Sequence, residues 1–191
     1  MATCDWPSND PLMLEYHDTE WGTPVHDDRK WFEFIILDAF QAGLSWKTIL
    51  NKRENFRRAF DGFDPRKVAE FDEAKVQQLL QDAGIVRNQL KIRAAVINAK
   101  AFLAIQEEFG SFDRYIWGFT GGKVVQSHLE KMSDMPVRTE LSDRISKDLI
   151  KRGFKFVGST IVYAFLQAAG VVNDHLTRCF RYKELSRSIP V

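Results

Sequence analysis

The sequence predicts an all-α protein built as one compact helical array. Signals that start and end helices recur along the chain, whereas the apolar–polar alternation that marks a β-strand is scarce. Apolar residues make up 45% of the chain, which is enough to form a packed core. The 191 residues contain no repeat, low-complexity tract or linker, so a single domain over residues 1–191 is expected.

The N-terminal half carries clear helix boundaries. Asp10 followed by Pro11 is typical of an N-cap and a first helical residue, and Gly22 lies where that helix would end. The same signals predict a helix from about 27 to 42 that stops at Gly43, one capped by Ser45, one starting at Asp64, and one running from Asp72 to near Gly84.

The C-terminal half is expected to be helical as well. Its clearest element is a long helix over residues 89–108, in which apolar residues recur at helical spacing from Ile92 to Leu103. Shorter helices are predicted over residues 112–119, 142–152, 157–169 and 173–180.

Composition narrows the class of protein without identifying a function. The net charge is +1, which gives no support for nucleic-acid binding but leaves a local basic face open. No signal peptide is visible, and the longest apolar run, residues 156–169, is too short to span a bilayer. We therefore expect a cytoplasmic protein outside the membrane, and expect it to act as a monomer.

Two cysteines and two histidines form a possible metal-binding set. Within the helix predicted for residues 173–180, His175 and Cys179 are four apart and would share one face. Cys4 and His17 lie near the other end of the chain and would complete a Cys2His2 set. Four protein ligands leave no open position, so such a metal would be structural and would join the two ends of the chain. Each residue taken alone is as well explained without a metal, and a disulfide between the cysteines is disfavoured by the absence of a signal peptide.

The segment at about 79–92 looks like a helix-hairpin-helix. Two apolar-periodic helices meet through a tight turn at Gly84 and Ile85, and such a turn exposes backbone N–H groups that suit a DNA phosphate. The usual second glycine of this motif is replaced by Val86. An ordinary turn between two helices explains the segment equally well.

One acidic residue stands inside an apolar helix near a group of aromatic residues. Asp38 shares a helical stripe with Trp31 and Ile35 and should face inward, which is costly for an unpaired carboxylate. It could cap a neighbouring helix, or it could form the floor of an aromatic pocket for a flat cationic guest. The aromatic residues of the first 46 positions are Trp6, Tyr16, Trp21, Trp31 and Trp46.

Several stretches resemble one known family over nearly the whole chain. The runs QAGLSW at 41–46 and KRGFKFVG at 151–158 are highly specific. The sequence is similar to the 3-methyladenine DNA glycosylase I family, which belongs to the helix-hairpin-helix DNA glycosylases. The stretches that carry the resemblance are Cys4–Trp6, Tyr16–Gly22, Phe40–Trp46, Lys52–Phe56, Asp82–Ile85, Lys151–Gly158 and Asn173–His175.

The resemblance implies an enzyme of base-excision repair that flips 3-methyladenine out of alkylated double-stranded DNA and hydrolyses its N-glycosidic bond. It implies a structural Zn²⁺ on Cys4, His17, His175 and Cys179. It also implies a base pocket in which Trp46 stacks on the base and Tyr16 contacts it, while the carboxylate at position 38 recognises it. We expect Trp21 and Trp6 to enclose the base as well.

DNA contacts are expected from three parts of the chain. Leu44 is a candidate wedge for the gap that the flipped base leaves, although leucine is also the commonest core residue. Phosphate contacts are assigned to the hairpin and to a basic run, either of which could equally be a solvated surface. The candidate residues are Gly84, Ile85 and Arg87 in the hairpin, with Lys151, Arg152 and Lys155 in the basic run.

The sequence departs from the family pattern in the pocket. The family usually carries Glu where this chain has Asp38, and some members carry Tyr where it has Met13. Asp is one methylene shorter, which withdraws the carboxylate by roughly 1.5 Å. Three alternatives remain open beside the enzyme: an inactive relative that binds DNA or the base without cleavage, a zinc hydrolase, and a helical protein with no nucleic-acid partner.

Overall fold

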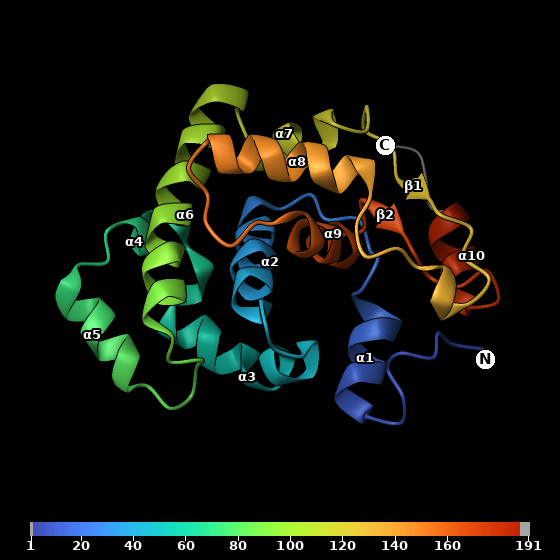
Figure 1. Ribbon diagram of the computed structural model, residues 1–191, viewed down its shortest axis with the longest axis horizontal. Coiled ribbons are helices and arrows are strands. Elements are labelled where there is room, and N and C mark those ends of the chain that lie inside the picture. Colours follow the sequence, from blue (N-terminus) through green and yellow to red (C-terminus); the bar gives the residue numbers. More distant parts are fainter. Residues whose placement is uncertain (1, 188–191) are drawn as a thin grey trace.

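The computed structural model describes residues 2–187, and helices dominate that part of the chain (Figure 1). The helices are α1 (Pro11–Thr19), α2 (Asp28–Gln41), α3 (Trp46–Ala59), α4 (Pro65–Ala69), α5 (Glu73–Gln81), α6 (Gln89–Phe109), α7 (Phe112–Gly118), α8 (Glu140–Lys151), α9 (Ser159–Ala168) and α10 (Phe180–Arg187). Two 3-10 turns, η1 (Asp61–Phe63) and η2 (Met132–Asp134), and two short strands, β1 (Val125–Gln126) and β2 (Val172–Asn173), complete the described elements.

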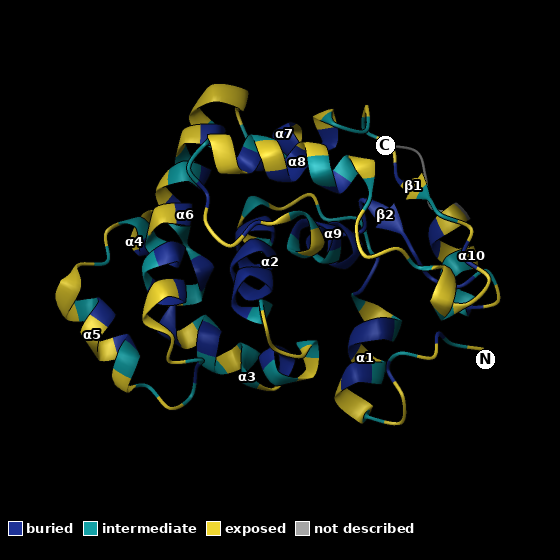
Figure 2. Cartoon of the chain, in the orientation of Figure 1, coloured by how far each residue is buried: buried dark blue, intermediate teal, exposed yellow. Residues whose placement is uncertain are grey.

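Helix α2 forms the centre of the molecule. It packs against α3, α6, α7 and α9, and Figure 2 shows α2 and α9 as dark, buried elements surrounded by partly exposed helices. Every residue from 31 to 40 of α2 is buried. The helix is therefore covered on all sides rather than along the single stripe that we predicted, and the carboxyl group of Asp38 is enclosed together with its apolar neighbours.

The predicted helix starts of the N-terminal half are confirmed by their capping contacts. A side-chain oxygen of each predicted cap accepts a hydrogen bond from a backbone N–H two or three residues later, which satisfies a donor that the first turn leaves free. The pairs are Asp10 with Met13, Ser45 with Thr48, Asp64 with Arg66 and Asp72 with Lys75. Asp27 likewise accepts from Lys30 at the start of α2.

The helix predicted over residues 173–180 is wrong. Residues 172 and 173 form β2, which pairs in parallel with β1, and the next helix begins only at Phe180. The reason lies in the partners of Asn173: its side-chain amide donates to Gln126 Oε1 at 2.8 Å, and its backbone carbonyl accepts from the N–H of Ser127. These bonds hold Asn173 beside the neighbouring strand, so no helix starts there.

The two ends of the described chain lie together. The N-terminal segment runs alongside α10 (Figure 1), and the N–H of Phe180 donates to the carbonyl of Ala2 at 3.0 Å. Within residues 2–187, no helix has both the length and the apolar character needed to cross a membrane.

Candidate active site

A cavity of about 200 Å³ opens where α1, α2, α3 and α9 meet the turn at η2. Three successive helices each supply one residue to it: Tyr16 from α1, Asp38 from α2 and Trp46 from the first position of α3. Trp6 and Trp21, on either side of α1, also line it. The structure thus brings together all five residues that the sequence analysis assigned to a base pocket.

The aromatic rings around the cavity contact one another. Trp6 packs edge-on against Trp21 at 5.1 Å between ring centroids and against Tyr16 at 6.3 Å. The rings of Tyr16 and Trp46 are 5.3 Å apart and tilted by 42°. Such mutual contacts hold the ring planes in place, so the cavity offers preformed aromatic faces to a flat guest.

Asp38 is the acidic residue among those that line the cavity, and it is 2% exposed. Its Oδ2 atom is buried and accepts no hydrogen bond from the described residues. Burial in these surroundings raises the pKa of Asp38 well above its usual value near 3.8, because water cannot solvate the ionised form. The indole nitrogens of Trp6 and Trp46 are likewise buried without an acceptor.

This arrangement is unlike that of a structural acid. A buried carboxylate that serves the fold is normally paired or accepts several hydrogen bonds, and Asp38 caps no neighbouring helix in the described chain. An unpartnered carboxyl group and two unpartnered indole N–H groups, all on residues that line one cavity, therefore point to a polar guest rather than to a stabilising role. Trp31, the remaining aromatic candidate, lies outside the cavity and donates to Asp113.

Six further residues line the cavity that were not among the candidates from the sequence. The additional lining residues are Gln41, Met132, Met135, Ala164, Gln167 and Ala168. Gln41 lies in the same motif as Trp46, one helical turn beyond Asp38, so helical spacing could have found it. The two Met residues come from a loop and the other three from α9, and no local pattern marks them as neighbours of Asp38.

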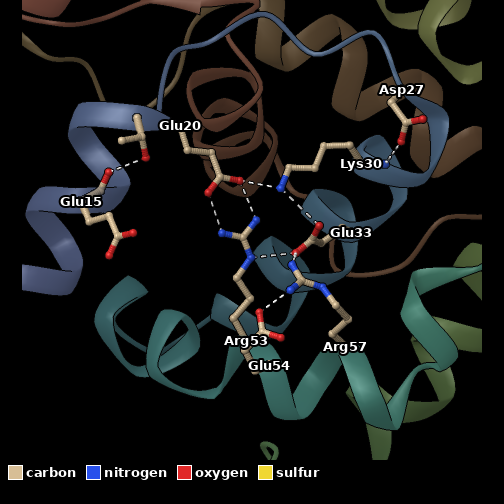
Figure 3. A network of polar contacts seen from close by, with 9 residues as sticks. Glu15, Glu20, Asp27, Lys30, Glu33, Arg53, Glu54 and Arg57 are labelled. Atoms are coloured by element: carbon tan, nitrogen blue, oxygen red, sulfur yellow. Dashed lines mark hydrogen bonds and ion pairs between the residues drawn. The ribbon is translucent and has the colours of Figure 1, made fainter.

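A partly buried ion-pair network joins the three helices that carry the pocket residues (Figure 3). The guanidinium group of Arg53, on α3, forms two hydrogen bonds of 2.6 Å with Glu20, which ends α1. The same group donates to Glu33 of α2 at 2.7 Å. Lys30 bridges the two carboxylates at 2.6 and 3.3 Å, so Glu20 has two cationic partners. Glu33 has a third in Arg57, at 2.9 Å.

The four predicted metal ligands also converge. All of them are buried, and their ligand atoms lie within 4.8 Å of one another. The Nε2 atom of His17 is 3.2 Å from Nδ1 of His175 and 3.6 Å from the sulfur of Cys179. His175 Nδ1 is 3.7 Å from the sulfur of Cys4. The cysteines are not joined by a disulfide.

These distances fit a tetrahedral zinc ion. Zinc–sulfur bonds of about 2.3 Å and zinc–nitrogen bonds of about 2.05 Å give nitrogen–sulfur edges near 3.5 Å and a nitrogen–nitrogen edge near 3.3 Å. The outer nitrogens are also bound in the way that metal-ligating histidines require. His17 Nδ1 bonds to Asp18 at 2.7 Å, and His175 Nε2 donates to the Trp21 carbonyl at 2.9 Å, so the facing nitrogen of each ring is left for a metal.

The ligands reach this cluster by a route that differs from the predicted one. Because no helix covers residues 174–179, His175 and Cys179 do not share a helical face. They lie instead in a buried turn between β2 and α10, where Cys179 N–H donates to the Leu176 carbonyl at 2.7 Å. A compact turn brings the two side chains together as effectively as the helical spacing would.

The predicted hairpin joins α5 to α6 through residues 82–88. Gly84 N–H donates to the side chain of Asp82 at 2.7 Å, while the Gly84 carbonyl accepts from Asn55 at 3.1 Å and from Lys52 at 3.3 Å. Ile85 is buried beneath the turn, and Arg87 is exposed on it. The turn is thus fixed by α3 from below and free on its outer side.

The remaining DNA-contact candidates are on the surface. Leu44 is 41% exposed in the turn between α2 and α3, beside the aromatic cavity. Lys155 is exposed and borders a surface groove with Leu90 and Arg93 of α6, on the hairpin side of the molecule. Lys151 is exposed at the end of α8. Arg152 instead pairs with Glu108 and Asp148 at 2.6 Å.

Comparison with known proteins identifies close relatives of this chain. The family model described as methyladenine glycosylase matches residues 6–182. DNA-3-methyladenine glycosylase 1 of Escherichia coli (strain K12) is 48% identical over 182 residues, covering 95% of this chain and 97% of the relative. The DNA-3-methyladenine glycosylase of Haemophilus influenzae is 43% identical over 176 residues, covering 92% and 95%.

A solved structure of such a protein has the same fold. It is a 3-methyladenine DNA glycosylase I from Staphylococcus aureus, solved to show the structural basis of its recognition of 3-methyladenine. It superposes on this chain with a TM-score of 0.91 at 37% identity, covering 93% of this chain and 95% of its own.

Proposed function

The chain belongs to the methyladenine glycosylase family, and we propose that the aromatic cavity around Asp38 is where it removes 3-methyladenine from alkylated DNA. The observation that carries this assignment is the buried, unpartnered carboxyl group among preformed aromatic faces. Methylation at N3 makes adenine cationic, and a flat cation is the guest that an anion among aromatic rings suits.

The base must leave the duplex before it can reach this cavity. Extruding it costs a few kcal/mol, and stacking on the ring of Trp46 recovers about 1–3 kcal/mol of that cost. Tyr16, Trp21 and Trp6 enclose the flipped base, and Asp38 binds its amino group and N7 side. Leu44, exposed beside the cavity, fills the space that the base vacates in the duplex.

Hydrolysis then needs little acid catalysis. The cationic base is already a good leaving group, so the bond between N9 and the deoxyribose carbon breaks with its electron pair going to the base. The sugar passes through an oxocarbenium-like state, and a water molecule adds its oxygen to that carbon and loses a proton to solvent. The residues that line the cavity contribute by holding the extruded base in place and by excluding water from the contacts between the base and the protein.

Asp38 performs this role in place of the usual Glu. Its carboxylate is withdrawn by roughly 1.5 Å, a gap that a water molecule or a small shift of the base spans. The charge that favours a cationic base is unchanged. This substitution is also the one observation that favours the second candidate, a relative that binds the base or damaged DNA without releasing it.

Contacts to the phosphate backbone are assigned to the outer side of the hairpin and to the nearby basic surface. The turn at Gly84 and Ile85 presents backbone near the start of α6, and Arg87 is exposed on that turn. Lys155 lies on the same side of the molecule, and Lys151 extends the basic surface. The partner is double-stranded DNA that contains alkylated bases.

The Cys2His2 cluster is assigned to a structural Zn²⁺. Cys4, His17, His175 and Cys179 supply the donor set and the spacing that tetrahedral zinc takes. When bound, the ion cross-links the N-terminal segment to the turn before α10. Four protein ligands leave no position for a catalytic water, which sets this site apart from that of a zinc hydrolase. Because the substrate is DNA, we place the enzyme in the compartment that holds the genome, and we expect it to act as a monomer.

The direct test is to incubate the purified protein with N-methylated duplex DNA and to identify the released base by chromatography. Release of 3-methyladenine by the wild-type protein, and its loss in Asp38→Asn with zinc content and folding unchanged, is the expected result. A folded, zinc-loaded wild-type protein that binds the DNA but releases no base would replace this function with that of an inactive relative. In that case Asp38→Glu should restore release.

A further inference from the structure

Gln167 of α9 borders the same cavity as Asp38, and its amide is held in one orientation. The side-chain nitrogen donates to Oδ2 of Asp174 at 2.7 Å and contacts the sulfur of Met135 at 3.2 Å. An ionised carboxylate and a thioether can only accept hydrogen bonds, so these two partners fix the end of the amide that carries the hydrogens. The residue is 9% exposed, and it reaches open space at the cavity.

The Asp174 carboxylate is itself immobilised. It is buried and accepts hydrogen bonds from the hydroxyl groups of Tyr163 and Ser127 as well as from Gln167. Three donors from different parts of the chain leave the carboxylate no freedom to rotate. The amide of Gln167 is therefore locked, both of its N–H groups face protein acceptors, and its oxygen remains available as an acceptor.

We propose that the side-chain oxygen of Gln167 is a second hydrogen-bond acceptor for the flipped base and sets the selectivity for a base that carries its amino group on C6. The proposal rests on the function assigned above. The amino group of 3-methyladenine offers two hydrogens, and α2 and α9, which pack together, supply one acceptor each: Asp38 and Gln167. 3-Methylguanine carries a carbonyl oxygen at the equivalent position. This oxygen is itself an acceptor, so it would face the acceptor oxygens of Asp38 and Gln167 without a hydrogen between them.

This arrangement would also compensate for the shorter side chain of Asp at position 38. A shorter carboxylate contacts the amino group less closely, and a rigid neutral acceptor from α9 supplies a bond that does not depend on the length of the acid. A neutral oxygen adds no charge repulsion to Asp38 in a cavity where burial already disfavours the ionised form. Gln167 thus discriminates between bases, whereas Asp38 attracts the cation.

The test compares Gln167→Met with Gln106→Met. Methionine keeps the length and packing of the side chain and removes its acceptor. Gln106 makes the same kind of bond, from its amide to Asp28 at 2.6 Å, but far from the cavity, so it is a matched control. Single-turnover excision of 3-methyladenine and of 3-methylguanine is measured from the same alkylated duplex, together with binding of the free 3-methyladenine base.

We expect the ratio of 3-methyladenine to 3-methylguanine excision to fall about tenfold in Gln167→Met, since one lost hydrogen bond is worth about a factor of ten. Free-base binding should weaken to the same extent, and Gln106→Met should retain the wild-type ratio. An unchanged ratio in a folded Gln167→Met protein that holds its zinc overturns the proposal. A wild-type protein that releases no 3-methyladenine overturns the assigned function instead.

A second variant tests the orientation of the amide. Asp174→Asn can donate to the Gln167 oxygen, which would turn the amide and direct its N–H groups at the cavity. The excision ratio should then fall although Gln167 is intact, an effect that a merely structural role does not produce. If Gln167→Met fails to fold, this variant decides alone, and a wild-type ratio in Asp174→Asn with normal zinc content counts against the proposal.

Discussion

The side chain at position 38 is buried at a cost in stability. A carboxyl group enclosed by rings and without a hydrogen-bond donor is costly, because the ionised form loses its hydration and gains no partner. The neutral form is less unfavourable, which is why burial raises the pKa of Asp38. A cationic base would supply the missing partner, so the cost falls on the empty enzyme and is offset when substrate binds.

The first prediction concerns the pH dependence of stability at this residue. Because the pKa of Asp38 is raised on folding, the stability contributed by its neutral form is fully present below pH 3.8 and is lost as the pH rises through the raised pKa. Asparagine stays neutral throughout. Asp38→Asn should therefore unfold with a higher free energy than the wild type at neutral pH, by about 1–3 kcal/mol, while losing excision.

Urea unfolding of both proteins at several pH values between 4 and 8 measures this effect. The wild type and the variant carry the same Cys2His2 cluster, so the effect of pH on metal binding cancels in the difference between their stabilities. The difference should be small at pH 4 and grow as the pH rises. Equal stability of the two proteins at pH 8 would show that Asp38 has a partner that stabilises its charge.

At the scale of the element, the arrangement of α1, α2 and α3 depends on the network in Figure 3. Burial raises the pKa of the Glu20 carboxyl, but hydrogen bonds and charge from Arg53 and Lys30 outweigh it and lower the pKa to about 2. Burial likewise opposes ionisation of Glu33, whose pKa the neighbouring cations nevertheless lower. Both acids are thus charged at neutral pH and hold three pocket-bearing helices together.

The second prediction follows for Arg53→Met. The variant leaves Glu20 and Glu33 with incomplete partners, and we expect it to lose about 3 kcal/mol of stability at pH 7, since Arg53 is only 11% exposed. A lowered pKa contributes stability that is present above pH 4.5 and lost as the pH falls towards 2. The difference between wild type and variant in chemical denaturation should therefore shrink across that window. Arg53→Lys, which keeps the charge, should recover part of the stability that Arg53→Met loses.

The third prediction separates the hairpin from the pocket. A Cβ atom on Gly84 would lie 2.9 Å from the Asp82 carboxylate and 3.1 Å from Asn55, so Gly84→Ala must displace the groups that fix the turn. We expect duplex DNA to bind about fivefold more weakly, a loss of about 1 kcal/mol, with binding of free 3-methyladenine unchanged. Gly118→Ala is the control, because its Cβ meets nothing within 4 Å. A parallel loss of base binding would mean that the turn also shapes the pocket.

Local signals predicted the elements well where the determining contacts are local. Asp10, Ser45 and Asp72 cap the helices that they were expected to cap, because a cap bonds to a backbone group three residues away. The failure at residues 173–180 has the opposite cause. Asn173 bonds to Gln126, 47 positions earlier, and nothing in the sequence near Asn173 reveals that partner.

At the scale of the whole molecule, the pocket was predictable only where local sequence motifs mark its residues. Tyr16 and Trp46 lie within motifs that resemble a known family, and Asp38 stands two positions before the second of these motifs, so their convergence could be expected from the sequence. Gln167 and Met135 reach the cavity only through the packing of α9 and of a loop against α2. Single-sequence patterns carry no information on such long-range contacts.

The Cys2His2 cluster connects the ends of the chain to three aromatic residues of the pocket. Cys4 is two positions before Trp6, His17 directly follows Tyr16, and the ring of His175 donates to the carbonyl of Trp21. The ring of Trp21 also packs edge-on against His175 at 4.6 Å between centroids. Loss of the ion would therefore loosen one side of the pocket and leave Asp38 and Trp46, which belong to α2 and α3, in place.

The fourth prediction is that removal of the metal by a strong chelator weakens base binding more than it weakens DNA binding. The hairpin lies at the opposite end of the molecule from the cluster (Figure 1), so duplex affinity should change little. Binding of free 3-methyladenine, followed by tryptophan fluorescence, should weaken at least tenfold.

The Tm should fall by about 10 °C, as expected for a loss of about 3–4 kcal/mol from a domain of this size. Zn²⁺ should restore both properties and Mg²⁺ neither, because thiolate and imidazole ligands select zinc. If the metal-free protein binds the base as tightly as before, the cluster holds the chain ends together without shaping the pocket.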